Sequence, residues 1–130
     1  MKIKGRHKRC IELARKVAET SLFRSFRHGA ILIRSGSFLS AAPNEIGFSH
    51  LGARFRNTPS NARMHAEINC VTGLPRSMTV GATMYVVRIG RDGKFRLSKP
   101  CDMCIAVLKF VGVKRVFYSI DEETMGEIRL

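Results

Sequence analysis

The chain has 130 residues, of which 45% are hydrophobic and 25% are charged. This length suits a single domain over residues 1–130, and the composition argues against a disordered chain. No run of about 18 apolar residues occurs, so we expect no membrane span. The basic start of the chain leads into an amphipathic segment, which argues against a secretory signal.

The net charge of +13 is unevenly distributed along the chain. Residues 1–63 hold 13 Lys and Arg against 3 Asp and Glu, whereas residues 64–130 hold 10 against 7. A positive field of this size attracts phosphate groups, whether on a nucleotide or along a nucleic acid. A solvated basic surface without a partner is the alternative interpretation.

Residues 6–20 are predicted to form an amphipathic helix, because apolar side chains recur there at helical spacing. The side chains expected to face the core are Cys10, Leu13, Ala14, Val17 and Ala18. Residues 21–27 are expected to connect this helix to the first strand.

The next segment is predicted to be a β-hairpin. Residues 29–33 and 38–42 are short apolar runs typical of strands, and the Arg-Ser-Gly-Ser sequence between them indicates a turn. The stretch 44–62 that follows is long and weakly patterned. Long loops in compact domains are often functional, so we expect this one to form a wall or lid over a site.

The second half alternates helices and strands. Helices are predicted at residues 64–71 and 101–111, and strands at 83–89 and 114–120, while 121–130 is ambiguous between an edge strand and an irregular segment. The order predicts a mixed sheet with helices on both faces. Its last strand–helix–strand unit should be a right-handed parallel crossover.

Two short motifs carry the chemistry, one around His65 and one comprising Cys101 and Cys104. A histidine and two cysteines three residues apart can hold one zinc ion. Three protein ligands leave a coordination position open, as in catalytic zinc sites, where bound zinc makes water a nucleophile at neutral pH. Glu67, two residues after His65, could move protons at that position.

A structural zinc site is the alternative, and it would need a fourth ligand. The candidates are Cys70, Cys10, His7, His28 and His50, none of which has a familiar short spacing to the other ligands. The simpler interpretation of Cys10 and Cys70 is that both are small buried hydrophobic residues. This cysteine usage suits a reducing, cytoplasmic compartment better than a disulfide framework.

The pattern H-x-E…P-C-x-x-C is the signature of zinc-dependent nucleobase deaminases, and the chain resembles the cytidine and deoxycytidylate deaminase superfamily beyond these motifs. Matching blocks occur in the family's order at residues 28–33, 42–44, 64–69, 81–86 and 98–104. The resemblance implies an α/β class structure, the three-layer α/β/α cytidine deaminase-like fold with a mixed five-stranded sheet. It also implies a Zn2+ cofactor and a homo-oligomer.

The same resemblance implies roles for individual residues. His65, Cys101 and Cys104 would hold the metal, and Glu67 would be the catalytic proton shuttle. Asn44 would hold the sugar or base of the substrate, and the Ala66 amide would contact the base carbonyl. The backbone from Ser98 to Pro100 would accept hydrogen bonds from the leaving amine.

Three arginines are candidate phosphate ligands. Arg54 and Arg56 lie in the long stretch before the His65 motif, and Arg27 lies just before the first strand. Solvated surface arginines are an equally good interpretation. The chain is also short, so it matches less well the relatives with long C-terminal helices, such as many tRNA adenosine deaminases.

The first functional hypothesis is hydrolytic deamination of cytosine in a small nucleotide or nucleoside, with dCMP converted to dUMP and ammonia. The alternative substrate is a base in single-stranded DNA or RNA. The charge favours that alternative, but Trp is absent, Tyr occurs twice, and several Phe lie in core-like runs, so no stacking platform is evident. A third hypothesis, from another class, is a nucleic-acid-binding module with a structural zinc.

Overall fold

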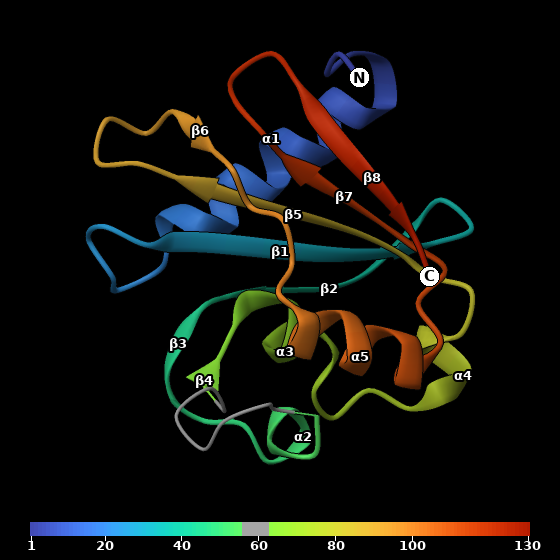
Figure 1. Ribbon diagram of the computed structural model, residues 1–130. Helices are drawn as coiled ribbons and strands as arrows, with labels where there is room; N and C mark the ends of the chain where they lie inside the picture. The colour runs from blue at the N-terminus through green and yellow to red at the C-terminus, as the bar shows by residue number, and fades with distance from the viewer. Residues whose placement is uncertain (56–62) are drawn as a thin grey trace.

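A computed structural model describes residues 1–55 and 63–130, shown as a ribbon in Figure 1. Helices lie on both sides of a central sheet. The elements in chain order are α1 (Gly5–Glu19), β1 (Arg27–Arg34), β2 (Ser37–Pro43), β3 (Glu45–Phe48), α2 (His50–Ala53), β4 (Arg63–Met64), α3 (Ala66–Val71), α4 (Arg76–Thr79), β5 (Thr83–Ile89), β6 (Phe95–Arg96), α5 (Asp102–Val111), β7 (Arg115–Ser119) and β8 (Met125–Arg129).

The sheet is mixed, as predicted. Its five-strand path runs β2-β1-β5-β7-β8, and the two-residue strand β6 adds to β5. The pairs β1–β2, β1–β5 and β7–β8 are antiparallel, whereas β5 and β7 are parallel and are joined through α5. The ambiguous C-terminal segment is the edge strand β8. Strands β3 and β4 form a separate small pair.

The strands are apolar on both faces because helices cover both faces. Side chains of a strand alternate between faces, so Ile31 packs with α1 whereas its neighbours Ala30 and Leu32 pack with α3 and α5. Tyr85 and Val87 of β5 likewise join the α1 cluster. The result is the three-layer α/β/α arrangement, with α1 on one side and α3 and α5 on the other (Figure 1).

Helix α1 packs closely on the sheet because β1 has a glycine at the crossing. A Cβ at Gly29 would lie 2.4 Å from both the Ala14 oxygen and the Ala18 nitrogen, which are backbone atoms. The predicted inward face of this helix is wrong at one position. Ile11 is fully buried, whereas Leu13 is 40% exposed.

The long stretch after β2 carries short elements instead of being irregular throughout. Strand β3 pairs with β4 through Glu45 and Met64, and α2 packs near α5. The side-chain amide of Asn69 donates to the Pro43 carbonyl at 2.9 Å, which ties α3 to the end of β2. Among the described residues, no helix is both long enough and apolar enough to cross a membrane.

Candidate active site

The two chemical motifs lie at the starts of two neighbouring helices. His65 is the N-cap residue of α3, and Cys101 is the N-cap residue of α5, both with extended backbone. Cys104 follows in the first turn of α5. Pro100 lies two residues before the first helical residue, Asp102. Its ring there keeps the preceding residue extended.

The three expected ligands come together. The ligand atoms of His65, Cys101 and Cys104 all lie within 4.8 Å of one another. His65 Nδ1 lies 3.3 Å from Cys104 Sγ and 3.7 Å from Cys101 Sγ. Tetrahedral zinc, with Zn–N of about 2.0 Å and Zn–S of about 2.3 Å, requires N to S separations of about 3.5 Å. The donor set and its spacing therefore fit zinc.

No fourth protein ligand joins this group among the described residues. The segment 56–62 contains no His, Cys, Asp or Glu. Cys70 is buried and its thiol points to the Ala30 carbonyl at 3.7 Å, while Cys10 is half-buried on α1, across the sheet. Both cysteines are packing residues in this structure, so the alternative of a closed structural zinc site lacks its fourth ligand.

The electrostatics of the group favour a metal-binding thiolate. Hydrogen bonding from Cys104 and from His65 lowers the pKa of Cys101 to about 4. The N-terminus of the ten-residue helix α5 also favours negative charge at this position. Cys104 is fully buried, and its hydrogen bond to Cys101 together with burial raises its own pKa.

Glu67 lies in the first turn of α3 beside this group and is 5% exposed. Burial raises the pKa of its carboxyl group above the usual value. A carboxyl group whose pKa is raised by burial is suited to proton transfer in general acid–base catalysis. The Cys104 thiol is a hydrogen-bond partner of this carboxyl group, so Glu67 is in contact with the three-residue group.

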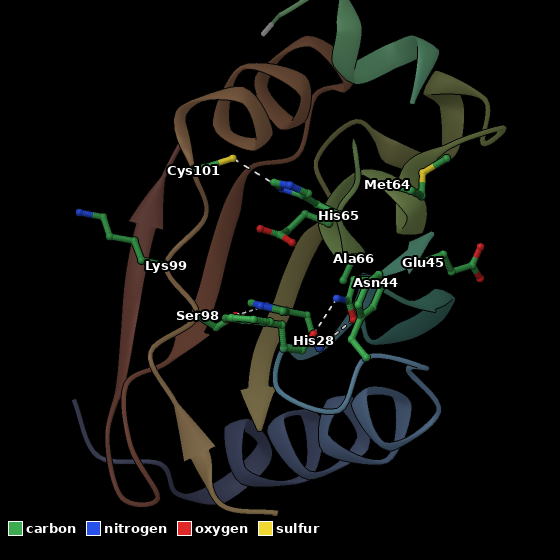
Figure 2. Close-up of a pocket in the computed structure, with 12 residues that line it drawn as sticks. His28, Asn44, Glu45, Met64, His65, Ala66, Ser98, Lys99 and Cys101 are labelled. Atoms are coloured by element: carbon green, nitrogen blue, oxygen red, sulfur yellow. Dashed lines mark hydrogen bonds between the residues drawn. The ribbon is translucent and has the colours of Figure 1, made fainter. Parts of the chain in front are cut away.

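A cavity of about 320 Å³ opens beside the group, within the usual range for small-ligand sites. Figure 2 shows its walls, which come from the start of β1, the end of β2, the start of α3 and the segment before α5. The lining residues are Phe23, Phe26, His28, Asn44, Glu45, Met64, His65, Ala66, Glu67, Ser98, Lys99 and Cys101.

Asn44 fixes the wall formed by the start of β1. Its side-chain oxygen accepts hydrogen bonds from the His28 amide at 2.9 Å and the Ser21 hydroxyl at 2.7 Å, and its side-chain nitrogen donates to the Phe26 carbonyl at 2.7 Å. The dashed lines in Figure 2 mark the contacts between residues drawn there. One amide hydrogen remains for a ligand in the cavity, because the nitrogen carries two.

His28, near the start of β1, and Ser98, in the segment before α5, lie next to each other in the cavity wall. The Ser98 hydroxyl lies 3.4 Å from His28 Nδ1, and the Ser98 amide donates to the Ser119 carbonyl at 2.9 Å. Burial, with the charges of Arg88 and His65, lowers the pKa of His28 to about 4. The imidazole is therefore neutral at pH 7, and it presents hydrogen-bonding nitrogen atoms without charge.

Three of the four residues expected to contact the substrate line this cavity. Asn44, Ala66 and Ser98 line it, whereas Pro100 is buried and is not among the lining residues. Ala66 is the first residue of α3, and the N–H of a first helical residue has no partner within its own helix. That donor is available to a ligand.

The two described candidate phosphate arginines, Arg27 and Arg54, lie in different places. Arg54 lies over the ring of Phe110 at 4.8 Å, near the end of α5 opposite Cys101, and does not line the cavity. Arg56 lies outside the described residues. Arg27 lines a second cavity with Arg24 and Arg91, and this cavity shares Phe23 with the first.

Sequence reasoning missed the aromatic wall. Phe26 was placed in a connector and given no role, but it is 57% exposed and lines the cavity, with the Arg88 guanidinium 5.0 Å from its ring centroid. Phe23 was also missed. The sequence did contain a clue to this wall: Phe23 and Phe26 lie in a connector, where no helical or strand periodicity predicts that a side chain is buried.

Comparisons with known proteins agree with this geometry. The family model described as the cytidine and deoxycytidylate deaminase zinc-binding region matches residues 4–120. The structure is similar to the dCMP deaminase of cyanophage S-TIM5 in its apo form, with a TM-score of 0.63 and 20% identity over 87% of this chain and 81% of that one. It is also similar to RibD of Acinetobacter baumannii, with a TM-score of 0.54 and 16% identity.

The RibD match covers 85% of this chain and 27% of RibD, and both structural similarities show the fold. No curated protein matches the sequence at a significant level. The family model and the His65–Cys101–Cys104 group agree that the cofactor is zinc.

Proposed function

This chain belongs to the cytidine and deoxycytidylate deaminase family, and from that premise we propose that it hydrolyses the cytosine of a small nucleotide, dCMP, to uracil with release of ammonia. The observation that carries the proposal is the three-ligand group, which has no fourth protein ligand among the described residues and has buried Glu67 beside it. A binding module with a structural zinc would need neither an open coordination position nor a buried carboxyl group there.

The proposed reaction replaces the amino group on C4 of cytosine by the oxygen of water. Zinc held by His65, Cys101 and Cys104 supplies Lewis-acid activation of that water. Glu67 would take a proton from the water and deliver it to N3 of the ring while the water oxygen bonds to C4; it would then take the proton of the new C4 hydroxyl and pass it to the amine, so that the C4–N bond breaks and ammonia leaves. The raised pKa of Glu67 supports this shuttling role.

The remaining residues would orient the base. The Ala66 amide donates to the base carbonyl, and the Ser98 carbonyl accepts from the amino group at C4, since both residues line the cavity. Asn44 offers its second amide hydrogen to the sugar. The Phe26 ring supplies an apolar face for the base.

A nucleotide is proposed instead of a nucleoside because of the second cavity. Arg24, Arg27 and Arg91 line that cavity, and Phe23 lines both cavities. The Arg27 guanidinium donates to the Gly90 carbonyl at 2.6 Å, while its Nε is buried without a hydrogen-bond partner among the described residues. A phosphate extending past Phe23 would meet these donors.

One observation favours single-stranded nucleic acid as a second candidate substrate. Phe26 is 57% exposed at the mouth of the cavity, and Leu22 and Leu97 are 86% and 56% exposed. Exposed aromatic and apolar side chains among arginines are typical of surfaces that stack unpaired bases. The net charge of +13 also favours a polyanion.

The deciding experiment is a deamination panel at fixed salt concentration. It contains cytidine, deoxycytidine, CMP, dCMP, dCTP, adenosine, and single-stranded DNA and RNA. We expect dCMP to have the highest kcat/KM. If the protein deaminates a polymer and none of the monomers, the proposed substrate changes from dCMP to single-stranded nucleic acid. If the zinc-loaded protein deaminates none of these substrates, the proposed deaminase function is wrong.

The double variant Arg24→Ala/Arg91→Ala tests the phosphate contact. We expect kcat/KM for dCMP to fall by about 10- to 100-fold, since hydrogen bonds between charged groups contribute about 1.5–3 kcal/mol each when buried and less when exposed. Deoxycytidine, which lacks the phosphate, should change by less than about threefold. Arg54→Ala is the matched control, because Arg54 lies against Phe110 instead. Equal losses for nucleotide and nucleoside would contradict the assignment.

A further inference from the structure

A third cavity lies on the other side of the sheet, at the opposite end of β5 from the active site. Its volume is about 490 Å³. The lining residues come from the first turns of α1, the β1–β2 turn and the starts of β5 and β7; they are Arg6, Arg9, Cys10, Ile33, Ser35, Gly36, Thr83, Tyr85 and Arg115. None of these residues lines the active-site cavity, and the proposed deaminase reaction uses none of them.

Three guanidinium groups from two separate elements line this cavity, and no carboxylate lines it. Arg6 and Arg9 project from α1, and Arg115 from β7. Arg115 has a long contact of 3.5 Å to Glu127, and its Nε is buried without a hydrogen-bond partner among the described residues. Arg6 and Arg9 make no hydrogen bond or ion pair with any described residue. Like charges gathered this way repel one another unless an anion lies between them.

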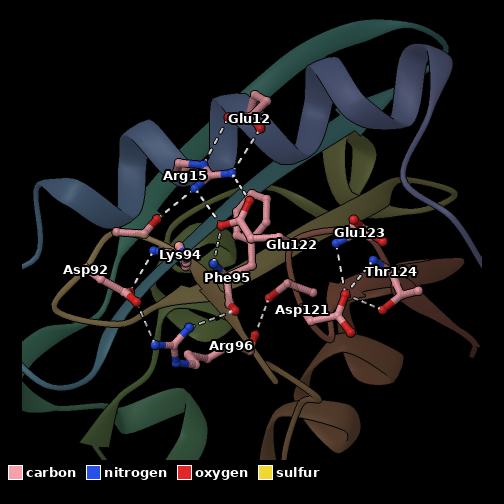
Figure 3. Close-up of polar contacts among 12 residues, drawn as sticks. Glu12, Arg15, Asp92, Lys94, Phe95, Arg96, Asp121, Glu122, Glu123 and Thr124 are labelled. Carbon is pink, nitrogen blue, oxygen red and sulfur yellow. Dashed lines mark hydrogen bonds and ion pairs between the residues drawn. The ribbon is translucent and has the colours of Figure 1, made fainter.

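Another arginine on the same helix, Arg15, has a guanidinium group whose charge is paired with carboxylates. Arg15 bonds Glu122 at 2.9 Å, Glu12 at 3.0 Å and the Gly93 carbonyl at 2.7 Å, as Figure 3 shows. Two carboxylates therefore neutralise one arginine at the middle of α1. No carboxylate of the described residues pairs with Arg6 or Arg9, about two turns earlier on the helix.

The start of α1 adds to this positive field. The helix has 15 residues, its N-cap residue Lys4 makes no side-chain capping hydrogen bond, and no acidic residue lies in its first turn. Arg6 and Lys8 instead place positive charge at the positive end of the helix dipole, which is unfavourable. A bound anion at the adjacent cavity would relieve both kinds of repulsion.

One wall of the cavity is rigid. The Tyr85 hydroxyl lies 2.7 Å from His7 Nδ1, and the Tyr85 ring stacks on Phe117 with centroids 5.0 Å apart. Burial raises the pKa of Tyr85 to about 12, so the phenol is neutral and does not repel an anion. Burial likewise raises the pKa of the Cys10 thiol.

We propose that the Arg6/Arg9/Arg115 cavity is a binding site for a small phosphate-bearing molecule, distinct from the deaminase centre. Guanidinium groups are the preferred protein donors for phosphate oxygens. Three arginines with one carboxylate nearby, Glu127 at 3.5 Å from Arg115, suit a ligand with at least two negative charges. The volume exceeds that of one phosphate and lies in the range for small molecules. The concave shape favours such a ligand over a nucleic acid backbone lying along a surface.

Tyrosine fluorescence gives a direct measurement. The chain has two Tyr and no Trp, so Tyr85 is the only such fluorophore in a Tyr118→Phe background. Pyrophosphate and inorganic phosphate are titrated at constant ionic strength, and the zinc content is measured after each titration. We expect saturable binding of pyrophosphate that is tighter than that of phosphate.

The key variant is Arg6→Ala/Arg9→Ala in that background, with Lys8→Ala/Lys16→Ala as control. Both remove two positive charges from exposed positions on α1, but only the first pair lines the cavity. We expect pyrophosphate binding at least about tenfold weaker in the first and changed by less than about twofold in the second. Arg9→Glu is a second, single variant expected to abolish saturable binding.

Three results would overturn the proposal: no saturable binding by the parent protein, equal weakening in both double variants, or displacement of pyrophosphate by a single-stranded oligonucleotide at lower concentration than by a nucleoside diphosphate. The last result would assign the arginines to nucleic acid. Deamination by each variant is measured separately. A protein that binds pyrophosphate but deaminates nothing would refute only the proposed function.

Discussion

On the face of the sheet covered by α3 and α5, the ionisable groups are buried and close together. Glu67 is 5% exposed and Cys104 is fully buried, and both lie next to His65. On the face covered by α1, the charged groups are exposed or paired at the surface. The Arg15 and Glu122 side chains are 19% and 38% exposed and bond each other at 2.9 Å.

The two faces therefore differ in how their ionisable side chains are placed: buried beside one another on one face, and at the surface on the other. Burying an unpaired ionisable group costs free energy, and such groups persist where chemistry needs a shifted pKa. Surface ion pairs contribute at most about 1 kcal/mol each and orient elements without reacting. Substitutions on the α3/α5 face should therefore affect the reaction, and those on the α1 face should affect stability or binding. The following variants test that division.

The largest effect is expected from removing a metal ligand. Cys104→Ala should lower the zinc-to-protein ratio from about one to near zero and bring deamination below detection, because two remaining ligands hold zinc poorly. Atomic absorption and a rate assay measure the two quantities. Cys70→Ala is the control: it removes a buried thiol outside the group and should keep zinc and activity, at a stability cost of about 1–2 kcal/mol. Equal zinc loss in both variants would count against the three-ligand site.

The next largest effect is expected from removing the proposed proton carrier. Glu67→Gln should lower kcat by about 10²- to 10⁴-fold, the usual contribution of general acid–base catalysis, while zinc stays bound. Glu45→Gln is the control, because Glu45 is an exposed carboxylate that lines the same cavity. If Glu67→Gln retains full activity, the proposed mechanism is wrong.

A stability effect is expected at the contact between α1 and the sheet. Gly29→Ala forces a Cβ to within 2.4 Å of two backbone atoms of α1, which cannot move like a flexible side chain. We expect the free energy of unfolding to fall by about 3 kcal/mol, at the upper end for overpacking. Gly36→Ala, in an open turn with φ of +79°, should cost about 1 kcal/mol. Urea denaturation measures both, and a smaller loss at Gly29 would show that α1 can shift on the sheet.

The smallest effect concerns the Arg15 contacts in Figure 3. Hydrogen bonding from Arg15 lowers the pKa of Glu122 below its usual value of 4.5. A depressed folded-state pKa gives stability that is present above the unfolded-state pKa and is lost as the pH falls through the folded-state pKa. The pair is partly exposed, so the contribution should be below about 1 kcal/mol. Between pH 7 and pH 3 the parent should lose more stability than Glu122→Gln, and parallel pH curves would show that the pair contributes nothing.

Most of the sheet and the metal group were predictable from the sequence. The strand at 83–89 and the crossover helix ending at Val111 follow from local periodicity, and the structure confirms both. The convergence of His65 with Cys101 and Cys104 was predicted from the deaminase resemblance and the helix starts, and it is confirmed as a group able to hold a metal.

The rest of the cavity was less predictable. Phe26 follows no period, so its exposure depends on the Asn44 contacts that hold the chain before β1. Arg54 was grouped with Arg27 because both are basic and upstream of the motif. The structure separates them, because α2 packs beside α5 and carries Arg54 to Phe110. Leu13 was wrongly predicted to face the core for a similar reason, because packing against the sheet determines which side of α1 is buried.

The sequence by itself determined the ligand types, the order of the elements and the family resemblance, because ligand spacing within a helical turn and hydrophobic periodicity are local properties. Tertiary structure decided which distant residues share a cavity, such as His28 with Ser98 and Arg6 with Arg115. Those neighbours depend on strand register and helix packing, which combine contacts over the whole chain and leave no short pattern in the sequence.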